Sequence, residues 1–146
     1  MSEDDIPEIA QMEFDYFGVP WKEASIGHYM EQDNTLFIVA KHMEQGKPGT
    51  WQVAGYIALM SILNESELIS IAVHEDYRNL GIARELLDIA YDMLKKRGSD
   101  LIHLEVRESN EAAIRLYESE GFEKDGVRKG YYDKPKEDAV LYTKVL

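Results

Sequence analysis

The sequence predicts an α/β or α+β domain in which helices flank a central mixed sheet. Strand-like and helix-like segments alternate along the chain, as they do in domains of this class. Near each end of the series, two strand-like segments follow one another and favour a hairpin. Because 146 residues are close to the usual size of one domain, we expect residues 1–146 to form a single domain.

Two helices are predicted at the beginning of the chain, over residues 5–14 and 22–31. Gly18-Val19-Pro20 lies between them and combines two turn-forming residue types. We therefore expect a turn to separate the two helices.

Three strands are predicted next, over residues 35–41, 52–62 and 68–73, where apolar and β-branched residues are concentrated. Residues 44–49 are polar and contain two glycines and a proline. This composition favours a hairpin-like link between the first two strands.

The clearest helix begins at Ile82. Apolar residues then recur with the spacing of one buried helical face, at Leu86, Ile89, Ala90, Met93 and Leu94. Cations at 95–97 suit the negative end of the helix dipole, and Gly98 is a natural end point.

Strand and helix alternate again in the last third of the chain. Residues 101–106 alternate apolar with polar side chains, as a half-buried strand does. Asn110 can cap a short helix over residues 110–117. Two closing strands are predicted over residues 122–131 and 139–145.

Composition excludes several classes of protein. The formal net charge of −12 disfavours nucleic acid as a partner and favours a cationic one. The chain has no cysteine, hence no disulfide framework, thiolate metal site or cysteine nucleophile. No apolar run could cross a membrane, and the acidic first residues lack the features of a secretion signal. We expect a cytoplasmic protein without a membrane contact.

The junction between the third strand and the long helix carries the most chemical information. Arg78, Gly81 and Ala83 lie where the loop enters the helix, whose unpaired N–H groups and positive dipole end can bind phosphate oxygens. The chain contains neither a P-loop motif nor a G-x-G-x-x-G fingerprint. Taken alone, R-x-x-G-x-A would indicate only an ordinary helix entry.

The R-x-x-G-x-A pattern, after a strand ending in Ala-Val, resembles the acetyl-CoA motif of the GNAT acetyltransferase superfamily. Residues 104–122 (LEVRESNEAAIRLYESEGF) resemble the second half of that fold. Together with residues 17–21 (FGVPW) and 130–146, they are particularly similar to the bacterial ribosomal-protein-alanine N-acetyltransferases. The likeness covers nearly the whole chain. It implies a GNAT fold, with a mixed, mostly antiparallel sheet of about six strands and about four helices.

The resemblance implies acetyl-CoA as co-substrate and no metal. The strand backbone would hold the pantetheine arm, the amides of the loop and helix start would take the pyrophosphate, and Val73 N–H would stabilise the oxyanion. The residues implied to bind the cofactor are Ile71, Ala72, Val73, Arg78, Asn79, Leu80, Gly81, Ile82, Ala83, Arg84 and Asn110.

Glu105 and Tyr117 match the base and acid proposed for the alanine acetyltransferases. A protonated α-amino group must lose a proton before attack, and a phenol can protonate the departing thiolate. Read alone, Glu105 would be a solvated strand residue and Tyr117 an interfacial one. Trp21, Tyr131 and Tyr132 are candidates for the acceptor groove or, equally, for the core.

The sequence departs from the family pattern in three places. The family's usual first strand is missing, which would expose a sheet edge. Ala83 stands where glycine is common and Arg78 where glutamine is frequent, and both belong to the tolerated pattern.

Three functions remain open on the sequence: an enzyme acting on the N-terminal alanine of a ribosomal protein, an enzyme acting on a small amine, and an acyl-CoA sensor. A lysine acceptor also remains open, as does the choice between a monomer and a homodimer.

Overall fold

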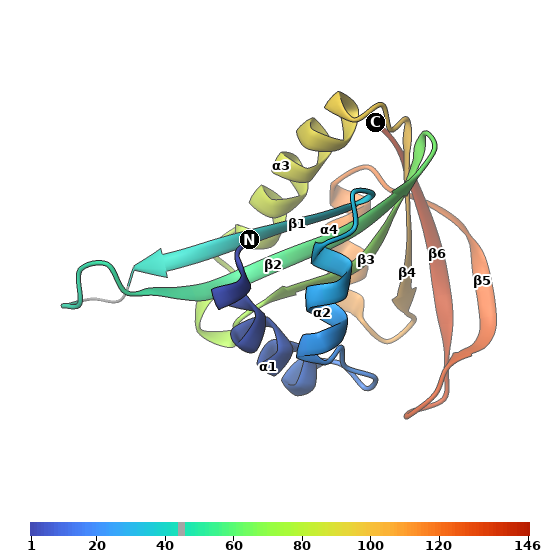
Figure 1. Ribbon diagram of the computed structural model, residues 1–146. Helices are drawn as coiled ribbons and strands as arrows, with labels where there is room; N and C mark the ends of the chain where they lie inside the picture. Colours follow the sequence, from blue (N-terminus) through green and yellow to red (C-terminus); the bar gives the residue numbers. More distant parts are fainter. Residues whose placement is uncertain (44–45) are drawn as a thin grey trace.

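The computed structural model describes residues 1–43 and 46–146, and over these residues it contains one six-stranded sheet in the order β1-β2-β3-β4-β6-β5 (Figure 1). Only the β3–β4 pair is parallel, so the sheet is mixed and mostly antiparallel. The strands are β1 (Thr35–Met43), β2 (Trp51–Ile62), β3 (Glu65–Val73), β4 (Leu101–Arg107), β5 (Glu123–Tyr132) and β6 (Glu137–Val145).

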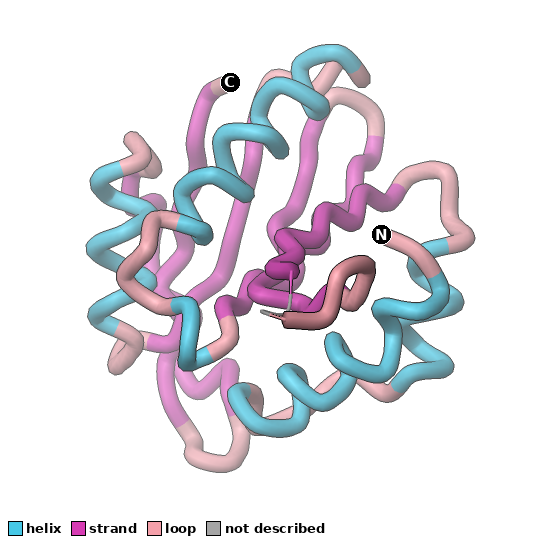
Figure 2. Tube along the Cα trace, turned by 90° about the vertical axis from the view of Figure 1, so that its left-hand side faces the viewer, coloured by secondary structure: helices cyan, strands magenta, loops and turns pink. Residues whose placement is uncertain are grey.

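Four α-helices cover the two faces of the sheet (Figures 1 and 2). They are α1 (Ile6–Tyr16), α2 (Glu23–Met30), α3 (Ile82–Lys96) and α4 (Glu111–Ser119). Side chains of α3 and α4 share one core with the sheet, and side chains of α1 and α2 share another with its opposite face. No helix in the described part of the chain is long and apolar enough to span a membrane.

The predicted fold class and the predicted series of elements are confirmed, with both terminal hairpins antiparallel. The link predicted over 44–49 includes residues 44–45, which lie outside the described residues. The largest boundary error is at β3, which starts three residues before the predicted 68. The cause is Ser66, which is buried because its hydroxyl is hydrogen-bonded to Ser61 and Ser99, so a polar side chain occupies an inward position.

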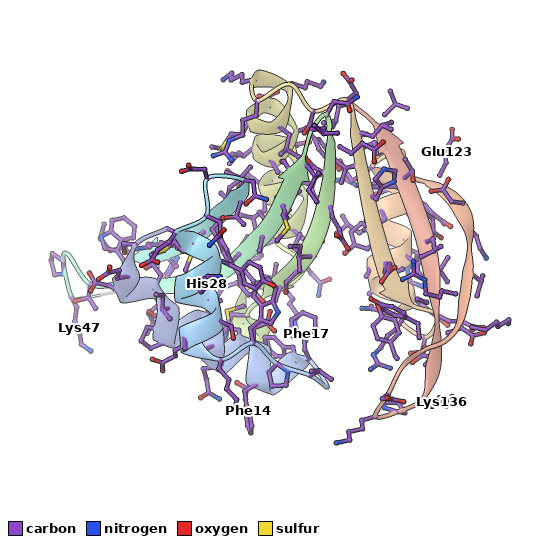
Figure 3. The ribbon with its side chains drawn as sticks, turned by 45° about the vertical axis from the view of Figure 1, so that its right-hand side comes forward. Phe14, Phe17, His28, Lys47, Glu123 and Lys136 are labelled. Carbon is purple, nitrogen blue, oxygen red and sulfur yellow. The ribbon has the colours of Figure 1, made fainter. Side chains whose placement is uncertain are left out.

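The two parallel strands diverge halfway along their length. Residues Glu65 to Leu68 of β3 pair with Leu101 to Leu104 of β4, and the pairing ends there. On its other edge β3 carries a bulge, because Ala58 pairs with Ser70 and Leu59 with Leu68, which leaves Ile69 as an extra residue. A bulge bends its strand, and here the bend coincides with the point where β3 leaves β4. Figure 3 shows the two strands close at one end and far apart at the other.

Candidate active site

A groove of about 850 Å³ lies where β3 and β4 diverge. The residues that line it come from the end of α1, from β3, from the start of α3, from β4 and from α4. They include every residue predicted to bind the cofactor except Leu80, and both predicted catalytic residues, Glu105 and Tyr117. Residues far apart in the sequence thus meet at one site.

The β3 wall of the groove offers backbone groups. His74 N–H donates to the Ala54 carbonyl at 2.9 Å, so His74 and Ala54 form a hydrogen-bonded pair of the antiparallel β2–β3 ladder. From this pair onward, hydrogen-bonded pairs alternate with pairs whose backbone groups point away from each other. Ala72 then faces β2 with its N–H and carbonyl, whereas Ile71 and Val73 direct theirs toward the open β4 side. The Val73 carbonyl accepts a hydrogen bond from Arg78 Nε at 3.1 Å, as expected for a group outside the ladder. An extended amide chain could pair with this free edge.

The loop between β3 and α3 ends in an uncapped helix start. Asn79 and Gly81 have positive φ values of 61° and 83°. Gly81 is the N-cap residue of α3 and has no side chain that could accept from the first amides of the helix. These N–H groups therefore remain available to an anion at the positive end of the helix dipole. The positive φ explains the glycine, since L side chains disfavour this region.

Two arginines at this end of the groove have protein partners. Arg78 lies over the Tyr16 ring, 4.6 Å from its centroid, in addition to its bond to Val73. Arg84 pairs with Glu120 at 2.8 Å and so links α3 to the end of α4. Arg84 therefore offers the groove its backbone amide rather than a free guanidinium.

Asn110 caps α4, as predicted: its Oδ1 accepts from Ala113 N–H at 3.2 Å. It also lines the groove. Leu80, which was also predicted to bind the cofactor, is 69% exposed and does not line the groove.

Glu105 lies on the β4 wall, on the face of the sheet opposite α3 and α4. Its Oε1 pairs with Arg128 Nη1 at 2.6 Å, and its side chain is 19% exposed. The Glu105 carboxyl group also raises the pKa of the neighbouring Tyr131 phenol. Glu105 is therefore ion-paired to Arg128 of β5 and mostly buried. It is not the freely solvated strand residue that the alternative interpretation expected.

Tyr117 reaches the groove from α4 with its ring in the core. The side chain is 4% exposed, and its ring meets the Phe122 ring edge-on with centroids 5.6 Å apart. Its hydroxyl forms no hydrogen bond with any residue that the structure describes. Burial, and to a lesser extent Tyr132, raise the pKa of this phenol above its ordinary value. Tyr117 thus presents a protonated hydroxyl to the groove at neutral pH.

The three aromatic residues predicted for the acceptor side lie in different places. Trp21 stacks on Tyr29 with centroids 5.0 Å apart and packs against the core under α1 and α2, not in the groove. Tyr131 and Tyr132 belong to β5 and lie near Glu105 of β4. Their rings are roughly perpendicular, with centroids 5.0 Å apart. Burial and then Glu105 raise the pKa of Tyr132 to about 12.

A buried polar network behind the β3 wall was not predicted. The Glu13 carboxyl group on α1 accepts hydrogen bonds from the Tyr56 hydroxyl, from Ser70 Oγ at 2.6 Å and from Trp21 N–H at 3.1 Å. Glu13 is 3% exposed. The network joins α1 and the loop before α2 to β2 and β3, and so fixes Phe17 and Gly18 at the groove mouth. A glutamate within an acidic helical segment carries no sequence signal for burial.

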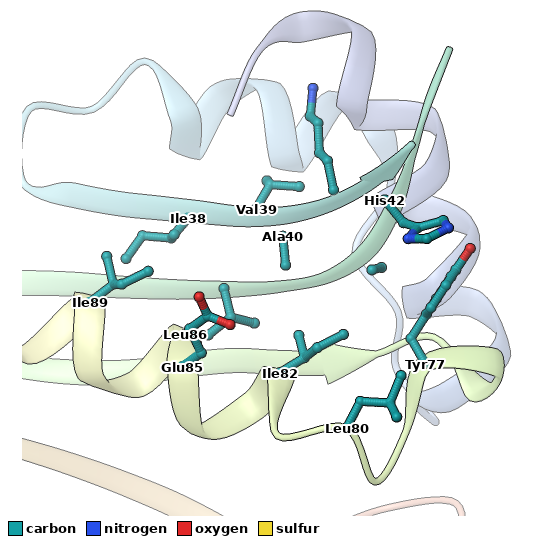
Figure 4. Close-up of a pocket in the computed structure, with 12 residues that line it drawn as sticks. Ile38, Val39, Ala40, His42, Tyr77, Leu80, Ile82, Glu85, Leu86 and Ile89 are labelled. Atoms are coloured by element: carbon teal, nitrogen blue, oxygen red, sulfur yellow. The ribbon is translucent and has the colours of Figure 1, made fainter. Parts of the chain in front are cut away.

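A second cavity, of about 450 Å³, lies between strand β1 and α3 (Figure 4). Apolar side chains such as Ile38, Leu86 and Ile89 line it, together with His42 and Tyr77. Strand β1 is at one edge of the sheet. Neither predicted catalytic residue lines this cavity, so the groove between β3 and β4 is the candidate active site.

Comparison with known proteins agrees with this geometry. Residues 6–122 match the model of the acetyltransferase (GNAT) family. The [ribosomal protein bS18]-alanine N-acetyltransferase of Escherichia coli is 34% identical over 139 residues, which cover 94% of this chain and 88% of the relative. A putative enzyme of the same name from Bacillus subtilis is 29% identical over 94% of this chain and 87% of its own.

Solved structures show the same relationship. The crystal structure of the ribosomal-protein-S18-alanine N-acetyltransferase from Escherichia coli superposes with a TM-score of 0.83 and 33% identity, over 99% of this chain and 90% of that one. Arabidopsis thaliana NAA60 in complex with acetyl-CoA has a TM-score of 0.89 at 17% identity, over 98% and 94% of the two chains, and shares the fold. Taken with the matched family model, these likenesses show that the chain belongs to the GNAT family and is an N-acetyltransferase.

Proposed function

We propose that this enzyme transfers the acetyl group of acetyl-CoA directly to the N-terminal α-amine of a ribosomal protein that begins with alanine. The observation that carries the proposal is the composition of the groove. Free backbone groups of β3, an uncapped helix start, Glu105 and Tyr117 all line one cavity. Each of these is a component that direct acetyl transfer from a thioester to an amine requires.

The residues present fit acetyl-CoA. The amides of the pantetheine arm match the free polar groups of Ile71 and Val73, and the pyrophosphate matches the amides that follow Gly81. Val73 N–H, which the ladder directs into the groove, is the candidate donor to the thioester carbonyl oxygen. When bound, acetyl-CoA supplies the activated acetyl group. No covalent enzyme intermediate is needed, in keeping with a chain that lacks cysteine.

Glu105 is the proposed proton acceptor. Near neutrality a free α-amine is largely protonated, since its pKa is about 7.7–8.0, and its lone pair becomes available only after that proton leaves. A carboxylate at the groove wall can take the proton directly or through one water. The same task for a lysine, with a pKa near 10.4, costs roughly 3–4 kcal/mol more at neutral pH. This difference favours an α-amine as the acceptor.

Tyr117 is the proposed partner of the leaving sulfur. Its raised pKa keeps the hydroxyl protonated, so it can donate a hydrogen bond to the thiolate as the C–S bond breaks. Since thiols of this kind have a pKa of about 8.5, complete transfer from so weak an acid is uphill. We therefore assign Tyr117 mainly to hydrogen bonding of the developing thiolate, whose final proton comes from the amine by way of Glu105 or solvent.

The acceptor is inferred from the relatives. Two relatives that are 34% identical bear names that specify the alanine of ribosomal protein bS18, and this chain aligns with 88% and 91% of their lengths. The side chains that match their proposed base and acid lie in the same groove.

The experiment is to follow thiol release from acetyl-CoA with a short peptide that starts with a free alanine. The controls are the same peptide acetylated at its N-terminus, a peptide whose only amine is a lysine side chain, and a panel of polyamines. Release with the free alanine peptide alone supports the proposal. Release with polyamines alone would replace the acceptor by a small amine, and acetyl-CoA binding without any release would favour a sensor.

A further inference from the structure

Arg128 lies beside Glu105, the side chain that is proposed to receive the acceptor amine. Its Nη1 lies 2.6 Å from Glu105 Oε1, and its guanidinium lies over the Tyr131 ring, 4.9 Å from the centroid. We propose that Arg128 is an internal competitor of the acceptor amine, which must displace it from Glu105 before acetyl transfer. The inference rests on the proposed function in one respect, namely that Glu105 receives the acceptor.

The sheet topology explains how a residue of β5 reaches a residue of β4. Ala139 of β6 pairs with Arg107 on one side and with Arg128 on the other, so these three residues form one row across three strands. Glu105, Leu141 and Gly126 form the next row. Because Gly126 has no side chain and its position is open, the Arg128 side chain can extend over Leu141 to Glu105.

The local chemistry is that of a site for an organic cation. A carboxylate supplies charge and hydrogen-bond acceptors, and the face of a tyrosine ring attracts a cation placed over it. The Tyr131 phenol lies near the same carboxyl group, which raises its pKa, and the ring lies under the Arg128 guanidinium. An α-ammonium group is a cation of similar demands, so it would compete with Arg128 for Glu105 Oε1.

The neighbouring Arg107, by contrast, has a structural role, because several contacts fix its side chain in place. Arg107 donates to the carbonyls of Asp133 and Pro135, pairs with Glu137 at 3.3 Å and lies over the Tyr132 ring, 4.3 Å from its centroid. Its side chain is 23% exposed. The Arg128 side chain is 54% exposed and, within the described part of the chain, has Glu105 as its polar partner. Arg128 can therefore swing into solvent without breaking the β5–β6 hairpin.

In the free enzyme Glu105 is neutralised by Arg128, and an amine gains access to the carboxylate by replacing one cation with another. Arg128 thus weakens the binding of the acceptor without affecting that of acetyl-CoA, whose proposed contacts lie on β3 and α3. Neutral or N-acetylated molecules cannot replace the guanidinium and would leave Glu105 covered.

The test compares Arg128→Gln, Arg128→Lys and the control Lys129→Gln. Lys129 is the adjacent residue of β5 and pairs with Asp138, away from Glu105. With a free-alanine peptide, we expect Arg128→Gln to lower the acceptor KM about two- to fivefold, the effect of a partly exposed ion pair. The KM for acetyl-CoA and kcat should stay near their original values, Arg128→Lys should resemble the original enzyme, and Lys129→Gln should change nothing.

A binding measurement keeps the inference separate from the proposed acceptor. Propylammonium is titrated into the protein without acetyl-CoA, and the ring signals of Tyr131 are followed by NMR. Tighter binding in Arg128→Gln, lost again when Glu105→Gln is added, supports displacement even if no peptide is turned over. An unchanged or weaker affinity in Arg128→Gln, or an acceptor KM that rises, would overturn the inference.

Discussion

The two walls of the groove contribute different chemical groups to the site: backbone groups on one side and side chains on the other. The β3 wall and the loop that follows it offer backbone N–H and carbonyl groups. The side chains of Ile71 and Ala72 pack into the two cores, and that of Arg78 is tied to the Val73 carbonyl. The β4 wall and α4 offer side chains, Glu105 and Tyr117. Substitutions on the first wall should therefore weaken cofactor binding only where they alter the backbone. Substitutions on the second wall should lower turnover directly, because they remove catalytic groups.

The largest effect is expected on the β4 wall, for Glu105→Gln. Loss of a proton acceptor typically lowers turnover by about 10²- to 10⁴-fold. The affinity for CoA, which depends on the other wall, should remain the same. Steady-state kinetics and calorimetric titration of CoA check the two parts. A variant that loses CoA affinity and turnover together would contradict the division between the walls.

Tyr117→Phe tests the α4 side with a smaller change. We expect kcat to fall about tenfold, because one hydrogen bond to the departing sulfur is lost, a contribution of about 1.5 kcal/mol. Tyr91→Phe is the matched control, since the Tyr91 hydroxyl also lacks a hydrogen-bond partner among the described residues but is buried and lies outside the groove. That control should keep full activity and unfold at an equal or higher temperature. Equal losses of activity in both variants would remove Tyr117 from the mechanism.

Gly81→Ala tests the backbone wall. An alanine at a φ of 83° adds about 1 kcal/mol of strain, and relief of that strain by movement of the loop should weaken CoA binding about fivefold. Gly98→Ala introduces the same strain at the other end of α3, where φ is 86°. Thermal unfolding should detect both substitutions, and CoA titration only the first. A Gly98→Ala protein that binds CoA equally poorly would show that the effect is general instability.

Ile71→Val is expected to have the smallest effect. Its backbone groups face the groove, and removal of one methyl group leaves them in place, so the KM for acetyl-CoA should change less than about twofold. The lost packing should lower the free energy of unfolding by about 0.5–1.5 kcal/mol. A tenfold change in KM, measured beside denaturant unfolding, would assign cofactor binding to the side chain after all.

Local signals predicted much of the fold. Sequence patterns correctly predicted the apolar face of α3, the asparagine cap of α4 and the alternation in β4. Each of these features depends on residues within a few positions of one another. The start of β3 was placed too late, because Ser66 is buried through hydroxyl contacts with residues from other segments. The buried Glu13 went unrecognised for the same reason, since its partners are up to 57 positions away in the sequence.

By itself, the sequence determined the class of fold, the order of its elements and the residues whose pattern resembles the GNAT motif. Those features follow from side-chain periodicity and from local backbone preferences, which neighbouring residues set. Only the tertiary structure decided that β3 and β4 diverge after four paired residues on each strand, that Trp21 packs away from the groove and that Arg128 covers Glu105. The physical reason is that these contacts join strands and helices distant in sequence, and their geometry is set by a bulge, a core and a strand register formed only when the whole sheet assembles.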